Sequence, residues 1–368
     1  MPSLRALLVL GVSVVDLACS GVPPPAMHAA AETRRGHIDV ATLHGTSLEH
    51  TATGESPDRQ VSVYVPPSYA ADAQRRYPVV YLLHGILDSD KVWTGNEQPW
   101  SSVQDVMDRG IAEGRFGDLI VVMPDERTRA GGSMYTNSTA TGAWEDFTVR
   151  ELVAWVDRTY RTVPRVSARA IAGHSMGGYG ALKLAMAHPD VFAAVYAMNP
   201  AGLGWGADLT PANPVFAEVT HTTTLDDLVA PPAADPHGMW KRMLIVGAQA
   251  FSPEPQRPPL FAALPFDAGA VPTQVFARWE ANFLVGHVAA HRDALARLRG
   301  IRFDSGYDDQ FRFIPPTTRQ FSAELTAAGI SHVFEEYNGD HRNRLWGPDG
   351  RIGTDVLPWL WRKLDHGE

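Results

Sequence analysis

The chain has 368 residues, of which 45% are hydrophobic and 20% charged, as in an ordinary globular protein with one large domain or two modest ones. The formal net charge is −9 and no block of basic residues stands out, so nucleic acid is not an expected partner. A mild acidic excess indicates no more than solubility.

The first thirty residues differ from the rest of the chain. Arg5 precedes an apolar run over residues 6–15 that is too short to span a bilayer, and small and Pro-rich residues follow it. This pattern predicts a signal peptide over residues 1–31 with an Ala-x-Ala-like cleavage site, and hence a secreted or periplasmic protein. One alternative is a lipoprotein attached to a membrane through Cys19, the only cysteine, although Asp16 stands where an apolar residue is usual. The other alternative is an unprocessed N-terminal tail.

Beyond the signal, predicted strands alternate with predicted helices. Strands are predicted over residues 36–50, 60–65, 77–83, 119–123, 170–172, 192–198, 301–303 and 331–337. Helices are predicted over residues 102–112, 146–160, 181–187, 290–298, 317–328 and 356–364. Nearly continuous apolar runs such as Val79–Leu83 are typical of strands covered on both faces. The alternation predicts an α/β fold, with a mostly parallel twisted sheet and helices on both faces.

The stretch from Asn199 to Gly300 breaks this alternation. It is rich in Pro and Gly, too long for a simple loop, and free of internal repeats. We therefore predict an inserted cap of short helices over residues 203–300, within a catalytic domain over residues 32–368. Lys241–Ala250 is compatible with either a strand or a buried helix. The tryptophans of this stretch, more typical of core than of a ligand platform, are Trp205, Trp240 and Trp279.

A serine motif lies between one predicted strand and the next helix. Gly173-His-Ser-Met-Gly177 fits G-x-S-x-G, and its strand, sharp turn and helix context is that of a nucleophile elbow. Gly173 and Gly177 leave room for the crossing backbone. Ser175 is therefore the predicted nucleophile, and its hydroxyl projects at a helix N-terminus, where free N–H groups stabilise negative charge.

A serine hydroxyl is a poor nucleophile and needs a base, which in turn needs an acid to hold its tautomer. In this arrangement the partners follow in the order Ser, acid, His, each on a loop after a later strand. His341, just past the last predicted strand, is the predicted base. Asp309, in the loop after strand 301–303, is the predicted acid, with Asp308 and then Asp304 as alternatives.

An oxyanion hole requires two backbone N–H groups aimed where negative charge develops. The amide of Met176, directly after the nucleophile, is one predicted donor. The second is expected from the loop after strand 77–83, where Gly85 lets the chain turn closely. We assign it to Ile86, with Leu87 as the alternative.

The remaining polar candidates have simpler interpretations. His84 and His174 adjoin the active loops and are expected to be structural or to line the pocket, whereas His332 is expected to be a packing residue. No metal and no cofactor is predicted, because acyl transfer by a Ser-Asp-His triad needs neither. Asp349 and Asp355 resemble a calcium loop only weakly, and a solvated turn is the preferred interpretation.

Several segments together resemble the putative-esterase family of α/β-hydrolases, which includes feruloyl esterases, S-formylglutathione hydrolases, siderophore esterases and mycolyltransferases. These segments are Tyr81–Gly85, Trp144–Phe147, Gly173–Ala181, His188–Phe192, Gly306–Asp309 and Gly339–His341. The resemblance covers roughly residues 60–199 and 301–341. It implies an α/β-hydrolase fold and an ester-cleaving triad, with the residues Ser175, Asp309 and His341 and with Ile86 and Met176 as oxyanion donors.

These observations predict an exported serine carboxylesterase that acts on a small-molecule or carbohydrate-linked ester, an aromatic acyl ester among them, through an acyl-enzyme intermediate. One alternative is an acyltransferase that moves the acyl group to a sugar or lipid hydroxyl. Another is a non-catalytic binding protein on the same scaffold, and a serine peptidase is a weaker one. The predicted cap departs from the compact family members, so the resemblance does not carry a substrate over, and the oligomeric state is not predicted.

Overall fold

The computed structural model describes residues 35–96, 102–210, 213–219, 237–266 and 271–367. The predicted signal peptide and Cys19 lie outside these described residues, so both remain predictions. Within the described part of the chain, no helix is both long enough and apolar enough to cross a membrane.

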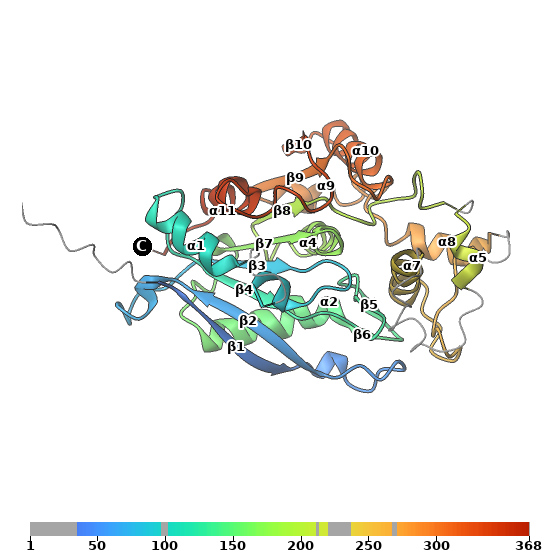
Figure 1. The fold of residues 1–368 in the computed structure, drawn as a ribbon, viewed down its shortest axis with the longest axis horizontal. Coiled ribbons are helices and arrows are strands. Elements are labelled where there is room, and N and C mark those ends of the chain that lie inside the picture. The colour runs from blue at the N-terminus through green and yellow to red at the C-terminus, as the bar shows by residue number, and fades with distance from the viewer. Residues whose placement is uncertain (1–34, 97–101, 211–212, 220–236, 267–270, 368) are drawn as a thin grey trace, which may run out of the picture. The chain divides into compact units, whose positions relative to one another are not determined.

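Eight strands form one sheet in the order β1-β2-β4-β3-β7-β8-β9-β10 (Figure 1). Their bounds are β1 His37–His44, β2 Asp58–Val65, β3 Val79–Leu83, β4 Ile120–Pro124, β7 Arg169–His174, β8 Ala194–Met198, β9 Gly300–Gly306 and β10 Val333–Tyr337. β2 runs antiparallel to both of its neighbours, and every other neighbouring pair is parallel. The prediction of a mostly parallel sheet is therefore confirmed. A short hairpin, β5 Asn137–Ser138 and β6 Gly142–Ala143, stands apart from it.

The helices are α1 Val103–Ala112, α2 Trp144–Asp146, α3 Val153–Thr159, α4 Met176–Ala187, α5 Val215–Val219, α7 Gly238–Phe251, α8 Thr273–Glu280, α9 Arg292–Ala296, α10 Ile314–Ala327 and α11 Leu357–Trp361. Two π-helical segments, η4 Phe147–Leu152 and η6 Ile352–Val356, lead into α3 and α11. Short 3₁₀ helices are η1 Thr46–Leu48, η2 Pro67–Tyr69, η3 Asp90–Trp93 and η5 Val166–Ala168. Because α2, η4 and α3 are consecutive, the single helix predicted over residues 146–160 is present.

Two apolar cores lie on the two faces of the sheet. Successive side chains of a strand point to opposite faces, and β3 shows this in its packing. Val79, Tyr81 and Leu83 belong to a core that also contains buried residues of α3, α4 and α10. Val80 and Leu82 belong to a second core with residues of α1, η6 and α11. Helices therefore cover both faces, as the continuous apolar runs predicted.

The chain between β8 and β9 folds into α5, α7, α8 and α9, so the prediction of inserted helices is confirmed. In Figure 1, α5, α7 and α8 lie together at the right, beyond the sheet. The ambiguous stretch Lys241–Ala250 is helical and forms most of α7, whose residues from Leu244 to Phe251 are all buried. A helical segment that is buried on every side has no polar face. Its sequence therefore lacks the alternation of polar and apolar residues that would have predicted a helix.

The C-terminal segment corrects one expectation. Asp355 was expected in a solvated turn, but it lies in η6 and its carboxylate accepts a hydrogen bond from the Arg302 guanidinium at 3.1 Å. The sequence did not show this pairing because Arg302 lies on β9, more than fifty residues earlier. Asp349 is exposed in the turn before η6.

Candidate active site

The predicted site residues follow parallel strands at the edge where their carboxyl ends meet. Ile86 follows β3, Ser175 follows β7, Asp309 follows β9 and His341 follows β10. In sheets of this kind ligands bind outside the carboxyl ends of the strands. The four loops therefore belong to one side of the sheet, and their contacts are described below.

Ser175 occupies a strained turn between β7 and α4. Its backbone has φ +58° and ψ −118°, a region that residues with a Cβ rarely adopt. A Cβ added to Gly173 would lie 2.2 Å from the Gly177 carbonyl oxygen, and one added to Gly177 would lie 2.1 Å from the Leu83 carbonyl oxygen. Both glycines are therefore required by backbone contact, as predicted from the motif.

His341 and Asp309 form a buried pair. The distance from His341 Nδ1 to Asp309 Oδ2 is 2.7 Å, and the two side chains are only 4% and 0% exposed. An ionised carboxylate can only accept hydrogen bonds, so Nδ1 carries the proton and Nε2 keeps a lone pair. Of the alternative acids, Asp308 is exposed, and Asp304 instead accepts from Arg351 Nε at 3.1 Å. The geometry favours Asp309 as the partner of the base.

The base lies beside the nucleophile turn. The ring of His341 is 4.6 Å from the ring of His174, the residue before Ser175, and its carbonyl oxygen is 2.7 Å from His174 Nε2. No hydrogen bond between Ser175 Oγ and His341 Nε2 is formed within the described part of the chain. Such bonds are often long without substrate and tighten in the complex. The structure thus brings the candidate acid and the candidate base together and places the candidate nucleophile next to them.

His174 has a structural role. Its ring is buried, and this burial, reinforced by electrostatic interactions with His341 and Arg342, lowers the pKa of His174 well below the ordinary value. It is therefore neutral and donates from Nε2 to the His341 carbonyl. This fixes the backbone of the base loop relative to the nucleophile turn.

The loop after β3 supplies the second candidate oxyanion donor. A Cβ added to Gly85 would lie 3.4 Å from Ser175 Cβ, so this loop runs close beside the nucleophile. The Leu87 amide already donates to Gly131 O at 2.7 Å. Across the residues that the structure describes, the Ile86 amide has no hydrogen-bond partner. Met176 is the first residue of α4, where amides lack partners within the helix. The geometry favours Ile86 and Met176.

Buried contacts hold that loop in place. His84 Nδ1 lies 2.8 Å from Gly85 O, and the Glu126 amide donates to His84 Nε2 at 2.9 Å, so His84 is a neutral structural residue. Tyr135 donates its hydroxyl to His84 O at 2.8 Å. Burial raises the pKa of Glu126 to about 8, despite a hydrogen bond from Thr148.

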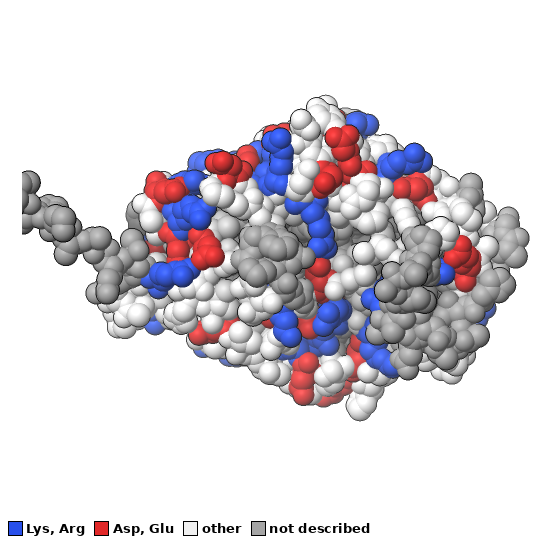
Figure 2. Space-filling model, viewed as in Figure 1, with Lys and Arg blue, Asp and Glu red and all other residues white. Residues whose placement is uncertain are grey.

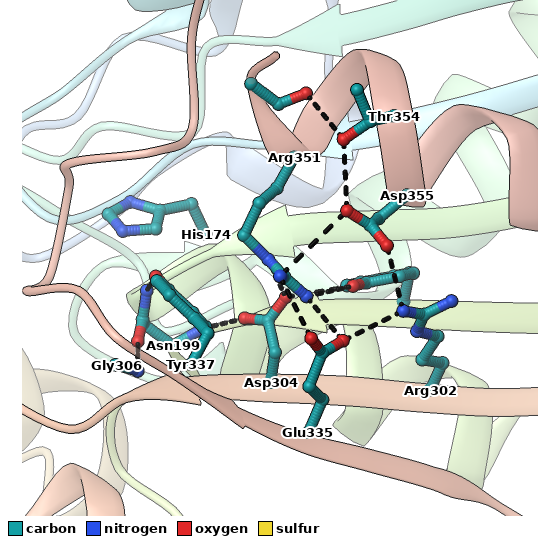
Figure 3. A network of polar contacts seen from close by, with 12 residues as sticks. His174, Asn199, Arg302, Asp304, Gly306, Glu335, Tyr337, Arg351, Thr354 and Asp355 are labelled. Atoms are coloured by element: carbon teal, nitrogen blue, oxygen red, sulfur yellow. Dashed lines mark hydrogen bonds and ion pairs between the residues drawn. The ribbon is translucent and has the colours of Figure 1, made fainter.

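Asn199 is a site residue that the sequence analysis missed. Its side chain is fully buried. Nδ2 donates to Tyr337 Oη at 2.7 Å, and Oδ1 accepts from the Gly306 amide at 2.7 Å (Figure 3). Nδ2 also donates to His341 O at 3.2 Å. It thus connects the loops after β9 and β10. The available signal was its position, a polar residue directly after the buried strand β8.

A charged network continues from Asn199 towards the C-terminal helix (Figure 3). Asp304, which is completely buried, accepts hydrogen bonds from Tyr196 Oη at 2.9 Å and from Arg351 Nε at 3.1 Å. Burial raises the pKa of Asp304, and the charge of Arg351 opposes that rise. Arg351 also donates to Glu335 at 2.9 Å. The network ties β8, β9, β10 and η6 together behind the acid and base loops.

A cavity opens at Ser175. The described residues that line it are Ile86, Met134, Ser175, Met176, Ala201, Gly202, Leu209, Met243, Leu244, Gly247, Phe251, Trp279, Phe283 and Phe313. Both candidate oxyanion donors are among them. α7 provides one wall, and Trp279 lies in the apolar core and also faces the cavity.

The described part of the chain holds no group of three or more His, Cys, Asp or Glu side chains arranged to bind a metal ion. On the face seen in Figure 2, acidic and basic side chains are interspersed, and neither sign dominates a large area of the described surface.

A family model matches most of this chain, and curated relatives match a shorter part of it. Residues 54–349 match the family model "Putative esterase". An esterase of Mycobacterium tuberculosis is 33% identical over 152 residues, which cover 40% of this chain and 29% of that protein. An endo-1,4-beta-xylanase/feruloyl esterase of Xylanibacter ruminicola is 29% identical over 180 residues, or 47% of this chain and 23% of the relative. The matches thus span less than a third of these curated relatives.

Solved structures superpose on most of this chain. A ferulic acid esterase superposes with a TM-score of 0.60 at 23% identity, covering 90% of this chain and 99% of the other. An S-formylglutathione hydrolase from Agrobacterium tumefaciens superposes with a TM-score of 0.55 at 18% identity, covering 90% and 97%. At these identities the likeness establishes the fold. Because the family model matches well over half of the sequence, the chain belongs to the putative-esterase family and has the α/β-hydrolase fold.

Proposed function

We propose that this protein is a serine carboxylesterase in which Ser175 is the nucleophile, His341 the base and Asp309 the acid. The observation that carries the proposal is the buried 2.7 Å contact between His341 Nδ1 and Asp309 Oδ2, beside a serine held in a strained turn. Membership of an esterase family supports the same reaction class. Fold alone does not imply activity, so the proposal depends on this local geometry.

The proposed reaction has two halves. Ser175 Oγ attacks the ester carbonyl while His341 Nε2 takes its proton, and the amides of Ile86 and Met176 stabilise the oxyanion. The ester C–O bond then breaks, and the alcohol leaves with the proton from His341. Water attacks the acyl-enzyme by the same route, which releases the acid and restores Ser175.

A small-molecule or carbohydrate-linked ester is the proposed substrate class, since one relative is named an endo-1,4-beta-xylanase/feruloyl esterase and a superposable structure a ferulic acid esterase. Those names describe the other proteins. For this chain they support a test on aromatic and carbohydrate-linked esters.

The direct test is hydrolysis of p-nitrophenyl acetate and butanoate by the purified protein and by Ser175→Ala. We expect the variant to lose about 10⁴-fold or more in kcat, because the nucleophile is removed while binding is retained. Ser47→Ala is the matched control, since the Ser47 hydroxyl is buried without a partner in η1. Full activity of Ser175→Ala would refute the proposed nucleophile.

The acyl-enzyme and the fate of the acyl group need separate measurements. A burst of p-nitrophenol equal to the enzyme concentration, with an acetyl mass on the peptide that contains Ser175, is expected if the second half-reaction is slower. Product analysis in the presence of a sugar or glycerol acceptor then distinguishes hydrolysis from acyl transfer, the alternative reaction on the same triad.

We also propose that the protein is exported, with a signal peptide over residues 1–31 and a catalytic domain over residues 32–368 that contains a cap at 203–300. The apolar run and the small residues after it support the signal. N-terminal sequencing of the mature protein is expected to show cleavage near residue 31. A lipid-modified N-terminus that disappears in Cys19→Ala would instead establish the lipoprotein.

A further inference from the structure

We propose that the cavity at Ser175 binds the acyl part of the ester and accepts acyl groups that are apolar to their ends, namely alkanoyl chains or unsubstituted aryl groups, and disfavours hydroxylated ones. This inference rests on the proposed esterase function and specifies its substrate. It separates this chain from esterases that act on hydroxycinnamoyl groups.

The position of the base decides which part of the ester enters the cavity. The alcohol must leave on the side of His341, because that residue gives it a proton. The His341 ring packs against His174 and Phe311, at centroid distances of 4.6 and 4.8 Å, and neither His341 nor these partners line the cavity. The cavity instead includes Ile86 and Met176, the candidate oxyanion donors. The group that stays attached to the carbonyl carbon, the acyl group, therefore extends into it.

The walls provide almost nothing for a polar substituent to bind. Among the described lining residues, only Ser175 and Trp279 carry a side-chain oxygen or nitrogen. The Trp279 indole N–H already donates to Ser252 Oγ at 2.8 Å. The other lining side chains are hydrocarbon or thioether groups. A phenolic hydroxyl in this cavity would lose its water contacts without gaining a partner, which is unfavourable.

The inner wall is built to stay apolar. Phe251, Trp279 and Phe283 pack on one another, with ring centroids 5.4 to 6.4 Å apart, and each is at most 4% exposed. Trp205 stacks behind Trp279 at 5.4 Å. A substrate that reaches this wall therefore meets a continuous aromatic cluster. Met134, Met176 and Met243 have flexible thioether side chains that adapt to chains of different shape.

Two substrate comparisons on the wild-type protein test the proposal. Each buried CH₂ is worth about fourfold, and hexanoate has four more CH₂ groups than acetate. Burial of only two of them makes kcat/KM for p-nitrophenyl hexanoate exceed that for acetate by about tenfold or more. Methyl cinnamate should be hydrolysed about tenfold faster than methyl 4-hydroxycinnamate, which differs by one buried hydroxyl. A preference for acetate, or for the hydroxylated cinnamate, would overturn the inference.

A polar wall should change both ratios. Met243→Gln replaces a half-buried lining residue by one of similar length that carries an amide. We expect the hexanoate-to-acetate ratio to fall about threefold or more and the hydroxycinnamate-to-cinnamate ratio to rise. Met239→Gln is the matched control on the same helix, since Met239 is 42% exposed and is not a lining residue. Equal ratios in Met243→Gln and Met239→Gln would contradict the proposal.

The outcomes also distinguish a failure of the proposed esterase function from a failure of the assignment of the cavity to the acyl group. If no ester is hydrolysed, or if Ser175→Ala retains activity, the proposed function itself fails. If esters are hydrolysed through Ser175 but with the opposite selectivity, the function stands and only the assignment of the cavity fails. The wild-type comparisons decide this even if Met243→Gln does not fold.

Discussion

At the scale of single residues, the base is held by its backbone as well as by its ring. His341 O accepts hydrogen bonds from His174 Nε2 and Asn199 Nδ2, while Asp309 holds the ring. The side-chain oxygen of Asn199 also accepts a hydrogen bond from the amide of Gly306, the last residue of β9 before the loop that carries Asp309. One buried side chain therefore sets the distance between the acid and base loops. Catalysis is sensitive to displacements of about 1 Å, so Asn199 acts as a positioning residue.

Asn199→Ala is expected to lower kcat by about tenfold with little change in KM, because the loops lose a shared anchor while the acyl cavity is untouched. It should also lower the free energy of unfolding by about 2 kcal/mol, since buried polar groups lose their partners. Steady-state kinetics and urea unfolding measure the two effects.

The control for Asn199→Ala is Thr318→Val, which removes a buried hydroxyl that bonds to Ile314 O within α10. It should lose about 1 kcal/mol of stability and keep its kcat. If both variants lose kcat equally, the effect of Asn199 is one of general stability, and the positioning role is wrong.

The residues of the proposed triad could be predicted because each carries a local signal. Ser175 lies in a motif, and His341 and Asp309 lie after strands in the expected chain order. Asn199 also follows a strand, but no motif and no expected chain order assigns a role to it. Its function depends on β8 lying beside β9, and the neighbours of a strand are not encoded in its own sequence. The structure was needed to see which loops it joins.

At the scale of secondary-structure elements, close backbone packing at the nucleophile turn outweighs the intrinsic helix propensity of the residues. Gly177 is inside α4, where an alanine favours a helix by about 1 kcal/mol over glycine. However, a Cβ there would meet the Leu83 carbonyl oxygen at 2.1 Å. That oxygen belongs to the backbone at the end of β3, so it cannot move aside as a flexible side chain would.

Gly177→Ala is therefore expected to lower the free energy of unfolding by about 3 kcal/mol or more and to abolish hydrolysis. Gly329→Ala is the control: Gly329 follows α10 with φ +70° and nothing lies within 4 Å of an added Cβ. The Gly329→Ala variant should lose only about 1 kcal/mol of free energy of unfolding, because alanine is disfavoured in a left-handed backbone conformation, and it should keep its activity. Thermal and urea unfolding compare the two, and a stable, active Gly177→Ala would contradict this account of the turn.

Most elements of the sheet could be predicted, because buried strands are continuous apolar runs and turns carry Gly or Pro. For the insertion, the sequence predicted that helices are present but not how they are arranged. In α7 the central residues Leu244 to Ala250 are buried on all sides, so the apolar pattern lacks a helical period. Their arrangement around the cavity depends on contacts with distant segments such as Met134 and Phe313.

At the scale of the whole molecule, a buried ion pair joins the C-terminal helix to the sheet. Arg351 in the turn before η6 contacts Asp304 of β9 and Glu335 of β10 (Figure 3). The sequence could not show this network, since its members lie on four separate segments. A buried carboxylate whose cation is removed is strongly destabilising. The network therefore holds the strands that carry the acid and base loops.

Arg351→Met should lower the free energy of unfolding by about 3–5 kcal/mol at pH 7. Burial raises the pKa of Asp304, and losing Arg351 raises it further. The folded variant then binds a proton that the unfolded chain releases, so its stability falls as the pH rises above about 4. The Arg351 hydrogen bond also lowers the pKa of Glu335, a stabilisation that exists only above about pH 4. The difference in free energy of unfolding between the wild-type protein and the variant should therefore become smaller as the pH falls towards 4.

Urea unfolding at pH 4, 5.5 and 7 measures this difference. Arg299→Met is the control, because Arg299 pairs with Asp365 at 2.8 Å where the two side chains are 45% and 36% exposed. Exposed pairs contribute about 1 kcal/mol or less, so this variant should show a small loss at each pH. A difference for Arg351→Met that grows at low pH would refute the assignment of Asp304 and Glu335 as its partners.

The contacts that hold the proposed acid and base come from other segments than the inserted helices at the cavity, and this has an evolutionary consequence. Within the described residues, the hydrogen bonds to the His341 ring and carbonyl and to the Asp309 carboxylate come from outside residues 203–300. Yet that segment supplies half of the described residues that line the cavity. Natural variants can therefore exchange the inserted helices, and so acquire new acyl preferences, while they inherit the same reaction. A chimera should keep Asp208, whose carboxylate accepts from the amides of Arg312 and Phe313 and joins the insert to the acid loop.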